Sequence, residues 1–121
     1  MKTISLITPT FNRSHTLLRL YHSIELQKYS NLEWIIVDDG STDASWQTIT
    51  NLSNENPNVK GIRFLRNYGK SQALHAGFAK AQGDVIITMD ADLQDSPDEI
   101  PELFRLITED NYDLISGWKK K

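Results

Sequence analysis

Short apolar runs alternate along the chain with longer stretches in which apolar residues recur at helical spacing. The runs at residues 3–8, 32–38, 59–65, 85–89 and 113–116 predict β-strands. The stretches at residues 14–27, from about 42 to 54, 71–81 and 97–109 predict helices. This alternation is typical of an α/β fold in which helices cover both faces of a parallel sheet.

The predicted strands differ in how they end and where they lie in the sheet. Residues 32–38 are nearly all apolar, which predicts a central strand buried on both faces, with Trp34 in the core rather than on a stacking platform. We expect the first strand to end before Pro9, because proline has no N–H to donate to a neighbouring strand. Consecutive strands usually lie side by side with right-handed crossovers, which predicts the strand order 3-2-1-4.

Polar clusters follow three of the predicted strands. They occupy residues 9–13, 38–41 and 90–94. Ligands of open parallel sheets bind beyond the carboxyl ends of the strands, where the strand order reverses. The predicted strand order brings the three clusters together in one cleft, and we interpret this cleft as the candidate site.

Asp90 and Asp92 are the candidate metal ligands of this cleft. Two carboxylates held about 4 Å apart repel each other by about 4 kcal/mol at an effective dielectric constant of about 20. A divalent cation between them removes this repulsion, and oxygen ligands suit Mg²⁺ or Mn²⁺. The alternative is a solvated acidic loop that favours the dipole of the following helix. The spacing leaves both interpretations open, and the position after a buried strand favours the metal site.

Asp38 and Asp39 present a similar choice. We expect one carboxylate to accept backbone N–H groups from the turn at residues 40–41 and the other to face the cleft. Lys70, in the basic turn at residues 66–70, either approaches a phosphate group or is solvated, and the second is more common for a lone surface lysine.

Composition and charge narrow the class of protein. The 121 residues contain no cysteine, and 13 Lys and Arg against 16 Asp and Glu give a formal net charge of −3. These values are typical of one soluble domain without disulfides, and the acidic balance argues against a nucleic-acid partner. No apolar run approaches the roughly 18 residues of a membrane span, so we expect a cytoplasmic location.

Four segments of the chain resemble the family 2 glycosyltransferases with the GT-A fold. They are PTFNR at residues 9–13, VDDGSTD at 37–43, RNYGKSQALHAGF at 66–78 and MDADLQDSPDEI at 89–100. The last segment, with DLISGWKKK at 113–121, is most similar to the polyprenyl-phosphate branch that includes dolichol-phosphate mannose synthase. The resemblance implies a metal-dependent, inverting transfer of a sugar from a UDP- or GDP-sugar to a polyprenyl phosphate or a glycan.

The resemblance also assigns roles to residues of the predicted cleft. It implies that Asp39 bonds the base, that Lys70 approaches the diphosphate and that Asp90 lies near the ribose and the metal. The implied metal ligands are Asp90, Asp92 and Gln94, and Asp90 and Asp92 are also the implied catalytic residues. The implied substrate-binding residues are Pro9, Thr10, Phe11, Asn12, Asp38, Asp39, Lys70, Asp90, Ala91 and Asp92.

Members of this family are longer than the present chain. The resemblance therefore implies that residues 1–121 are the donor-binding N-terminal part of a GT-A domain that is apparently truncated here. For the whole protein it implies association with the cytoplasmic face of a membrane. An unfinished sheet exposes an edge strand, which predicts self-association.

Three other functions compete with this interpretation. The first is a nucleotide-sugar binding module without transfer activity, which an assay of glycosyl transfer or donor hydrolysis distinguishes from an enzyme. The second is a receiver-type signalling domain, in which the acidic pair follows the first strand, whereas the pairs here follow the second and fourth. The third is a nucleotidyltransferase, whose glycine-rich and basic phosphate loop after the first strand is missing from this sequence.

Overall fold

A parallel sheet with the strand order β3-β2-β1-β4-β5 forms the centre of the computed structural model, which describes residues 3–27, 30–91, 105 and 115–116. The strands are β1 (Ile4–Thr10), β2 (Leu32–Asp39), β3 (Val59–Phe64), β4 (Val85–Thr88) and β5 (Ile115–Ser116). The helices are α1 (Ser14–Leu26), α2 (Ser45–Glu55) and α3 (Lys70–Lys80). The predicted order 3-2-1-4 is confirmed, and β5 extends the sheet beside β4.

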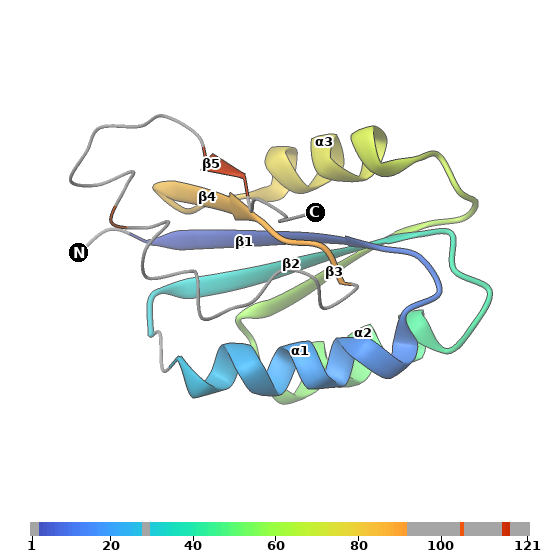
Figure 1. Cartoon of the computed structure of the whole chain (residues 1–121), viewed down its shortest axis with the longest axis horizontal. Helices are drawn as coiled ribbons and strands as arrows, with labels where there is room; N and C mark the ends of the chain where they lie inside the picture. Colours follow the sequence, from blue (N-terminus) through green and yellow to red (C-terminus); the bar gives the residue numbers. More distant parts are fainter. Residues whose placement is uncertain (1–2, 28–29, 92–104, 106–114, 117–121) are drawn as a thin grey trace, which may run out of the picture.

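The helices cover the two faces of the sheet unequally. Figure 1 shows α1 and α2 on one face and α3 on the other. Alternate residues of β1 and β2 point to opposite faces, so each of these strands contributes to two apolar cores. The core under α1 and α2 contains Leu6, Trp34, Ile36, Leu17, Leu20 and Ile49. The core under α3 contains Ile7, Ile35, Val37 and Ala73. Burial on both faces explains why β2 is apolar along nearly its whole length.

Trp34 is part of the core, as predicted. Its side chain is 1% exposed, and its indole N–H donates to the hydroxyl oxygen of Thr8 over 2.8 Å. The hydrogen bond satisfies the one polar atom of the indole, so the ring is buried at no loss of hydrogen bonding. Trp34 is therefore unavailable as a stacking surface for a ligand.

Pro9 lies inside β1, and the prediction that the strand ends before it was wrong. Pro9 is paired in register with Val37 of β2. The carbonyl oxygen of Ile7 accepts the N–H of Met89. At this end of β1 the N–H and C=O groups of odd-numbered residues therefore point toward β4. β4 ends at Thr88, so in the described part of the chain no strand lies beside Pro9 on this side. The missing N–H of Pro9 therefore costs no hydrogen bond between strands. The proline therefore extends β1 into the candidate site without breaking a ladder.

Two other boundaries differ slightly from the predictions. α2 begins at Ser45 rather than near residue 42, because the Asp43 carboxylate accepts the N–H of Ser45 over 2.9 Å and holds the preceding residues as a turn. α3 begins at Lys70, directly after Gly69, whose φ of 101° ends the extended chain that leads into the helix. The predicted helix at residues 97–109 and the first two residues of the last predicted strand lie outside the described residues, apart from Arg105.

Candidate functional site

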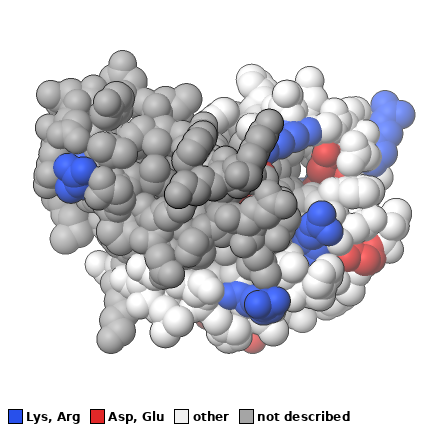
Figure 2. Space-filling view, viewed as in Figure 1, with Lys and Arg blue, Asp and Glu red and all other residues white. Residues whose placement is uncertain are grey.

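A cleft of about 250 Å³ lies at the carboxyl ends of β1, β2 and β4. It is lined by Pro9, Thr10, Phe11, Arg13, Asp39, Lys70, Asp90 and Ala91. The structure thus brings together residues from all three predicted clusters and the first residue of α3, Lys70. Figure 2 shows basic and acidic side chains interspersed at the end of the molecule where the carboxyl ends of β1 and β2 lie in Figure 1.

The end of β1 forms one wall of the cleft. Phe11 is 44% exposed there, so its ring offers apolar surface to a ligand. Thr10 is buried, and its hydroxyl oxygen has no hydrogen-bond partner among the described residues. Buried hydroxyl groups are normally hydrogen-bonded, so this group is a candidate to contact a ligand in the cleft.

Asp38 performs the turn role that we expected of one of the two aspartates. It is fully buried, and its Oδ1 accepts the backbone N–H of Ser41 over 3.0 Å. Its Oδ2 is buried without a partner among the described residues. Asp38 pairs in register with Thr10, but it does not line the cleft, so its predicted contact with a substrate stays a prediction.

Asp39 lies in the cleft wall and also holds the turn that follows β3. Its Oδ1 accepts the backbone N–H of Tyr68 over 2.8 Å, and its Oδ2 accepts that of Gly69 over 3.0 Å. The sequence does not predict this second role. Carboxylate oxygens have lone pairs left after one hydrogen bond each, so Asp39 can still accept a bond from a ligand.

Asn12 braces the turn after β2 against the end of β1. Its side-chain oxygen accepts the backbone N–H groups of Thr42 over 2.8 Å and of Asp43 over 3.3 Å, and its own N–H donates to the Ser41 hydroxyl over 2.8 Å. The φ of Asn12 is 53°, a conformation that asparagine adopts more readily than most residues. Its side chain lies on this turn and not in the cleft wall, and a contact with the nucleoside stays a prediction.

Asp43 strengthens the same turn. Burial by itself would raise its pKa, but hydrogen bonds from Ser45 and Ser14 outweigh this effect and hold the pKa of Asp43 below its usual value. The carboxylate thereby connects the beginnings of α1 and α2, the two helices that follow the strands of the cleft. The cleft wall is therefore held by hydrogen bonds on the side of β1 and β2.

Lys70 and Asp90 form an ion pair in the cleft wall. The Lys70 ammonium lies 3.0 Å from both carboxylate oxygens of Asp90. The Lys70 side chain is 61% exposed, whereas that of Asp90 is only 19% exposed. Lys70 is therefore both exposed and paired with the acidic end of β4, and its contact with a phosphate group stays a prediction.

The predicted metal site is only partly within the described residues. Asp90 is described, and Asp92 and Gln94 are not. Within the described part of the chain no three His, Cys, Asp or Glu side chains are grouped so that they could hold a metal ion. Asp90 is a carboxylate, the ligand type that a hard divalent cation prefers, and in this structure an ammonium group lies against both of its oxygens.

Arg13 is a cleft residue that the sequence analysis did not select. It lines the cleft at the start of α1, and its backbone N–H donates to the hydroxyl of Ser45 over 3.1 Å. Its place as the last residue of the first polar cluster was the available signal. Arg66, by contrast, lies over the ring of Tyr68 at 4.9 Å and does not line the cleft.

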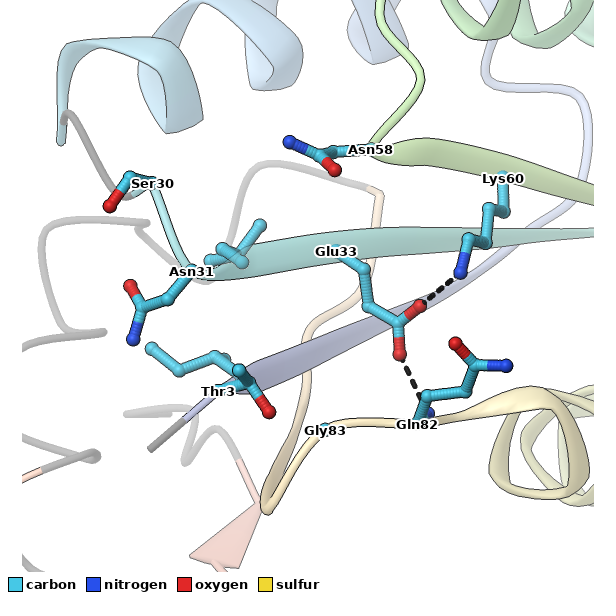
Figure 3. A pocket seen from close by; sticks show the side chains of 10 residues that line it. Thr3, Ser30, Asn31, Glu33, Asn58, Lys60, Gln82 and Gly83 are labelled. Atoms are coloured by element: carbon cyan, nitrogen blue, oxygen red, sulfur yellow. Dashed lines mark hydrogen bonds and ion pairs between the residues drawn. The ribbon is translucent and has the colours of Figure 1, made fainter. Parts of the chain in front are cut away.

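A second cavity, of about 310 Å³, lies at the opposite end of the sheet. Figure 3 shows the Glu33 carboxylate in it between the ammonium of Lys60 and the backbone of Gln82. Glu33 accepts hydrogen bonds from Lys60 over 2.6 Å, from the Gln82 N–H over 2.7 Å and from the Ser5 hydroxyl. Because these donors already occupy the carboxylate, we interpret this cluster as a structural link between three strands and the turn before β4.

The described helices offer no candidate for a membrane span, because none is both long and apolar enough.

Comparison with known proteins gives consistent matches over most of the chain. The undecaprenyl-phosphate 4-deoxy-4-formamido-L-arabinose transferase of Yersinia pestis (strain Pestoides F) is 38% identical over 122 residues, which cover 95% of this chain and 36% of that protein. The chain therefore spans about a third of the length of the curated relatives it matches.

Solved structures show the same fold. A mannosyltransferase from Pyrobaculum calidifontis in complex with GDP-Man and Mn²⁺ matches with a TM-score of 0.78 and 23% identity, over 89% of this chain and 33% of that chain. Glucosyl-3-phosphoglycerate synthase from Mycobacterium tuberculosis in complex with UDP matches with a TM-score of 0.71 and 26% identity, over 88% of this chain and 40% of that chain. The expected GT-A fold is thereby confirmed. The family model described as glycosyl transferase family 2 matches residues 5–121, and the chain belongs to this family.

Proposed function

We propose that the chain is the donor-binding part of a metal-dependent, inverting glycosyltransferase that moves a sugar from a nucleotide-diphospho-sugar to a polyprenyl phosphate. The observation that carries the proposal is the cleft in which Asp39, Lys70 and Asp90 meet at the carboxyl ends of the strands. Membership of glycosyl transferase family 2 supports the reaction class. The names of the relatives, which are undecaprenyl-phosphate sugar transferases, support the lipid acceptor.

The nucleoside would bind between the end of β1 and Asp39. Phe11 supplies exposed apolar surface, and Thr10 supplies a hydroxyl group that has no partner among the described residues. Asp39 can accept a hydrogen bond from a base N–H or a ribose hydroxyl while it keeps the bonds to Tyr68 and Gly69. The cleft wall is held by the protein before a donor arrives, so few groups need to be ordered on binding.

The diphosphate would lie toward Lys70 and Arg13, which are the basic residues among the described lining of the cleft. As the bond between the sugar and the diphosphate breaks, negative charge builds up on the departing phosphate, and cationic groups placed there stabilise it. A divalent cation, held by Asp90 with Asp92 and Gln94, would supply Lewis-acid stabilisation of the same charge. Mg²⁺ and Mn²⁺ both suit such an oxygen ligand set.

The acidic residues of the described cleft also fit a phosphate acceptor. A hydroxyl acceptor needs a general base to remove its proton, whereas a lipid phosphate is already an anionic nucleophile. Of the described cleft residues, Asp39 accepts two backbone N–H groups and Asp90 pairs with Lys70. Both described carboxylates are thus engaged by donors of the protein, which fits a lipid phosphate as the acceptor and fits equally well a general base outside the described residues.

Calorimetric titration tests the donor site. UDP and GDP, and then their sugar conjugates, are titrated into the chain and into Asp92→Ala, with Mn²⁺ or Mg²⁺ and with EDTA. We expect one of the two nucleotides to bind in a metal-dependent way and the binding to weaken in Asp92→Ala. If neither nucleotide binds, the donor-binding proposal for this chain is wrong. Glycosyl transfer or donor hydrolysis then separates an enzyme from a binding module without transfer activity.

Two predictions concern partners, the first of this chain and the second of the longer protein. β3 and β5 are the outer strands of the sheet in the described part of the chain, and unpaired sheet edges attract other strands. We propose self-association through such an edge, which size-exclusion chromatography over a range of concentrations tests. We also propose association with the membrane surface where a polyprenyl phosphate would be reached, and flotation with vesicles tests it.

A further inference from the structure

The ion pair between Lys70 and Asp90 places a positive group of the protein where a divalent cation would bind. We propose that the Lys70 ammonium competes with the divalent cation for Asp90, and that the diphosphate of the donor relieves this competition by taking Lys70 as its own partner. Binding of the metal and binding of the donor are thereby coupled through one side chain. The proposal rests on the proposed function, because it takes its metal and its diphosphate from it.

The geometry of the pair makes the competition direct. The Lys70 Nζ lies 3.0 Å from Oδ1 and 3.0 Å from Oδ2 of Asp90, so it covers the side of the carboxylate between the two oxygens. A Mg²⁺ ion binds carboxylate oxygens at about 2.0–2.1 Å. An ammonium and a divalent ion on the same pair of oxygens would lie in close contact and repel each other. The low exposure of Asp90, 19%, leaves little water to screen this repulsion.

Lys70 can leave Asp90 without moving the backbone. It is the first residue of α3, and the preceding Gly69 is fixed by its N–H bond to Asp39. The side chain is 61% exposed and ends in a flexible four-carbon stem. Lys70 also lines the cleft that would hold the diphosphate, so two phosphate groups there offer its ammonium an alternative partner.

The coupling follows from these two contacts. A diphosphate that attracts Lys70 removes the competing ammonium from Asp90, and a metal on Asp90 displaces Lys70 toward the diphosphate. By thermodynamic linkage each ligand then raises the affinity for the other by the same factor. Without donor, the affinity for the metal is lowered by the competition with Lys70. The metal and the donor therefore bind together.

The first experiment uses Mn²⁺ alone, with free Mn²⁺ followed by electron paramagnetic resonance. We expect Lys70→Met to raise the affinity for Mn²⁺ about fivefold, the upper end for a partly exposed ion pair. Lys80→Met removes the same charge from the last residue of the same helix and is the matched control, with unchanged affinity expected.

A double variant locates the effect. The competition acts through the Asp90 carboxylate. Lys70→Met should therefore raise the affinity for Mn²⁺ in the unaltered chain but not in a chain that already carries Asp90→Asn. The proposal is overturned if Lys70→Met binds Mn²⁺ no better than the unaltered chain, or if the gain persists without the Asp90 carboxylate. Circular dichroism of each variant establishes that the comparison is between folded chains.

The second experiment measures the factor by which UDP or GDP raises the affinity for Mn²⁺. We expect this factor to be smaller in Lys70→Met than in the unaltered chain, and an equal factor in both would contradict the release of Lys70 by the diphosphate. If neither nucleotide binds any of the chains, the proposed function fails. The comparison with Mn²⁺ alone then still decides whether Lys70 competes for Asp90.

Discussion

Gly40, in the turn after β2, packs directly against the backbone of Arg66, in the turn after β3. A Cβ atom on Gly40 would lie 2.3 Å from the carbonyl carbon of Arg66 and 2.4 Å from the backbone nitrogen of Asn67. The φ of Gly40 is 78°, which side chains rarely adopt. This contact and the hydrogen bonds of Asp39 hold the two turns together, and the position of Lys70 in the cleft depends on both.

We expect Gly40→Ala to destabilise the chain by at least about 3 kcal/mol, because the left-handed conformation alone costs a side chain about 1–2 kcal/mol and the clash is with backbone atoms. Urea unfolding measures the loss, and nucleotide titration should show weaker binding. Gly69→Ala is the matched control. Its φ of 101° is also left-handed, but nothing lies within 4 Å of its Cβ, so it should lose only the backbone strain. Equal losses in the two variants would show that the contact with Arg66 contributes nothing.

We expect Asp39→Asn to lower the free energy of unfolding by about 2 kcal/mol, the value of a hydrogen bond to a charged group. An amide has one acceptor oxygen, whereas the backbone N–H groups of Tyr68 and Gly69 need two. Nucleotide binding should weaken as well, because the turn that positions Lys70 loosens. Urea unfolding and calorimetry measure the two effects.

The control for Asp39 is its neighbour in sequence. Asp38→Asn should be less damaging, because only Oδ1 of Asp38 accepts a hydrogen bond from the described residues and an amide keeps one acceptor. A larger loss of stability in Asp38→Asn than in Asp39→Asn would contradict the assignment of the turn-holding role to Asp39.

The sheet was predictable from the sequence because its determinants are local. The apolar run of β2 indicates burial on both faces, and short connections with right-handed crossovers then leave few strand orders. The extension of β1 through Pro9 was not predictable in the same way. It depends on β4 ending at Thr88, which is a property of a neighbouring strand far away in the sequence.

The candidate site, like the sheet, was predictable from the sequence only in part. Sequence positions after strands predicted which segments meet, and the structure places Asp39 and Asp90 in one cleft. The bond from the Ser41 N–H to Asp38 was predicted because it is local, whereas the partners of the other side chains come from contacts between distant turns. Lys70 and Asp90 are separated by 20 residues in the chain, and nothing in either local pattern indicates that they pair. The turn that Asn12 braces begins 29 residues further on, at Ser41.

The close approach of α3 to the sheet depends on Gly77. A Cβ atom there would lie 2.4 Å from Cγ2 of Ile7 in β1. We expect Gly77→Ala to destabilise the chain by about 1–2 kcal/mol, although alanine is the better helix former, because the helix must move away from the strand. Ile7→Ala removes the opposing atoms, and in that background Gly77→Ala should be neutral or stabilising. A double-mutant cycle by urea unfolding measures the coupling, and simple additivity of the two changes would contradict the contact.

The Glu33 cluster predicts how stability depends on pH. Burial raises the pKa of Glu33, but hydrogen bonds from Lys60, Ser5 and Gln82 outweigh it, so the pKa lies below its ordinary value of 4.5. A carboxyl group with a lowered pKa in the folded chain stabilises it above the unfolded pKa, and this stability is lost as the pH falls through the folded pKa. We therefore expect the difference in the free energy of unfolding between the unaltered chain and Glu33→Gln to be constant above about pH 5 and to shrink below it. Urea unfolding at a series of pH values measures the difference, with Glu55→Gln at the exposed end of α2 as the control. A difference that stays the same down to pH values where the chain unfolds would mean that the charge of Glu33 does not contribute to stability.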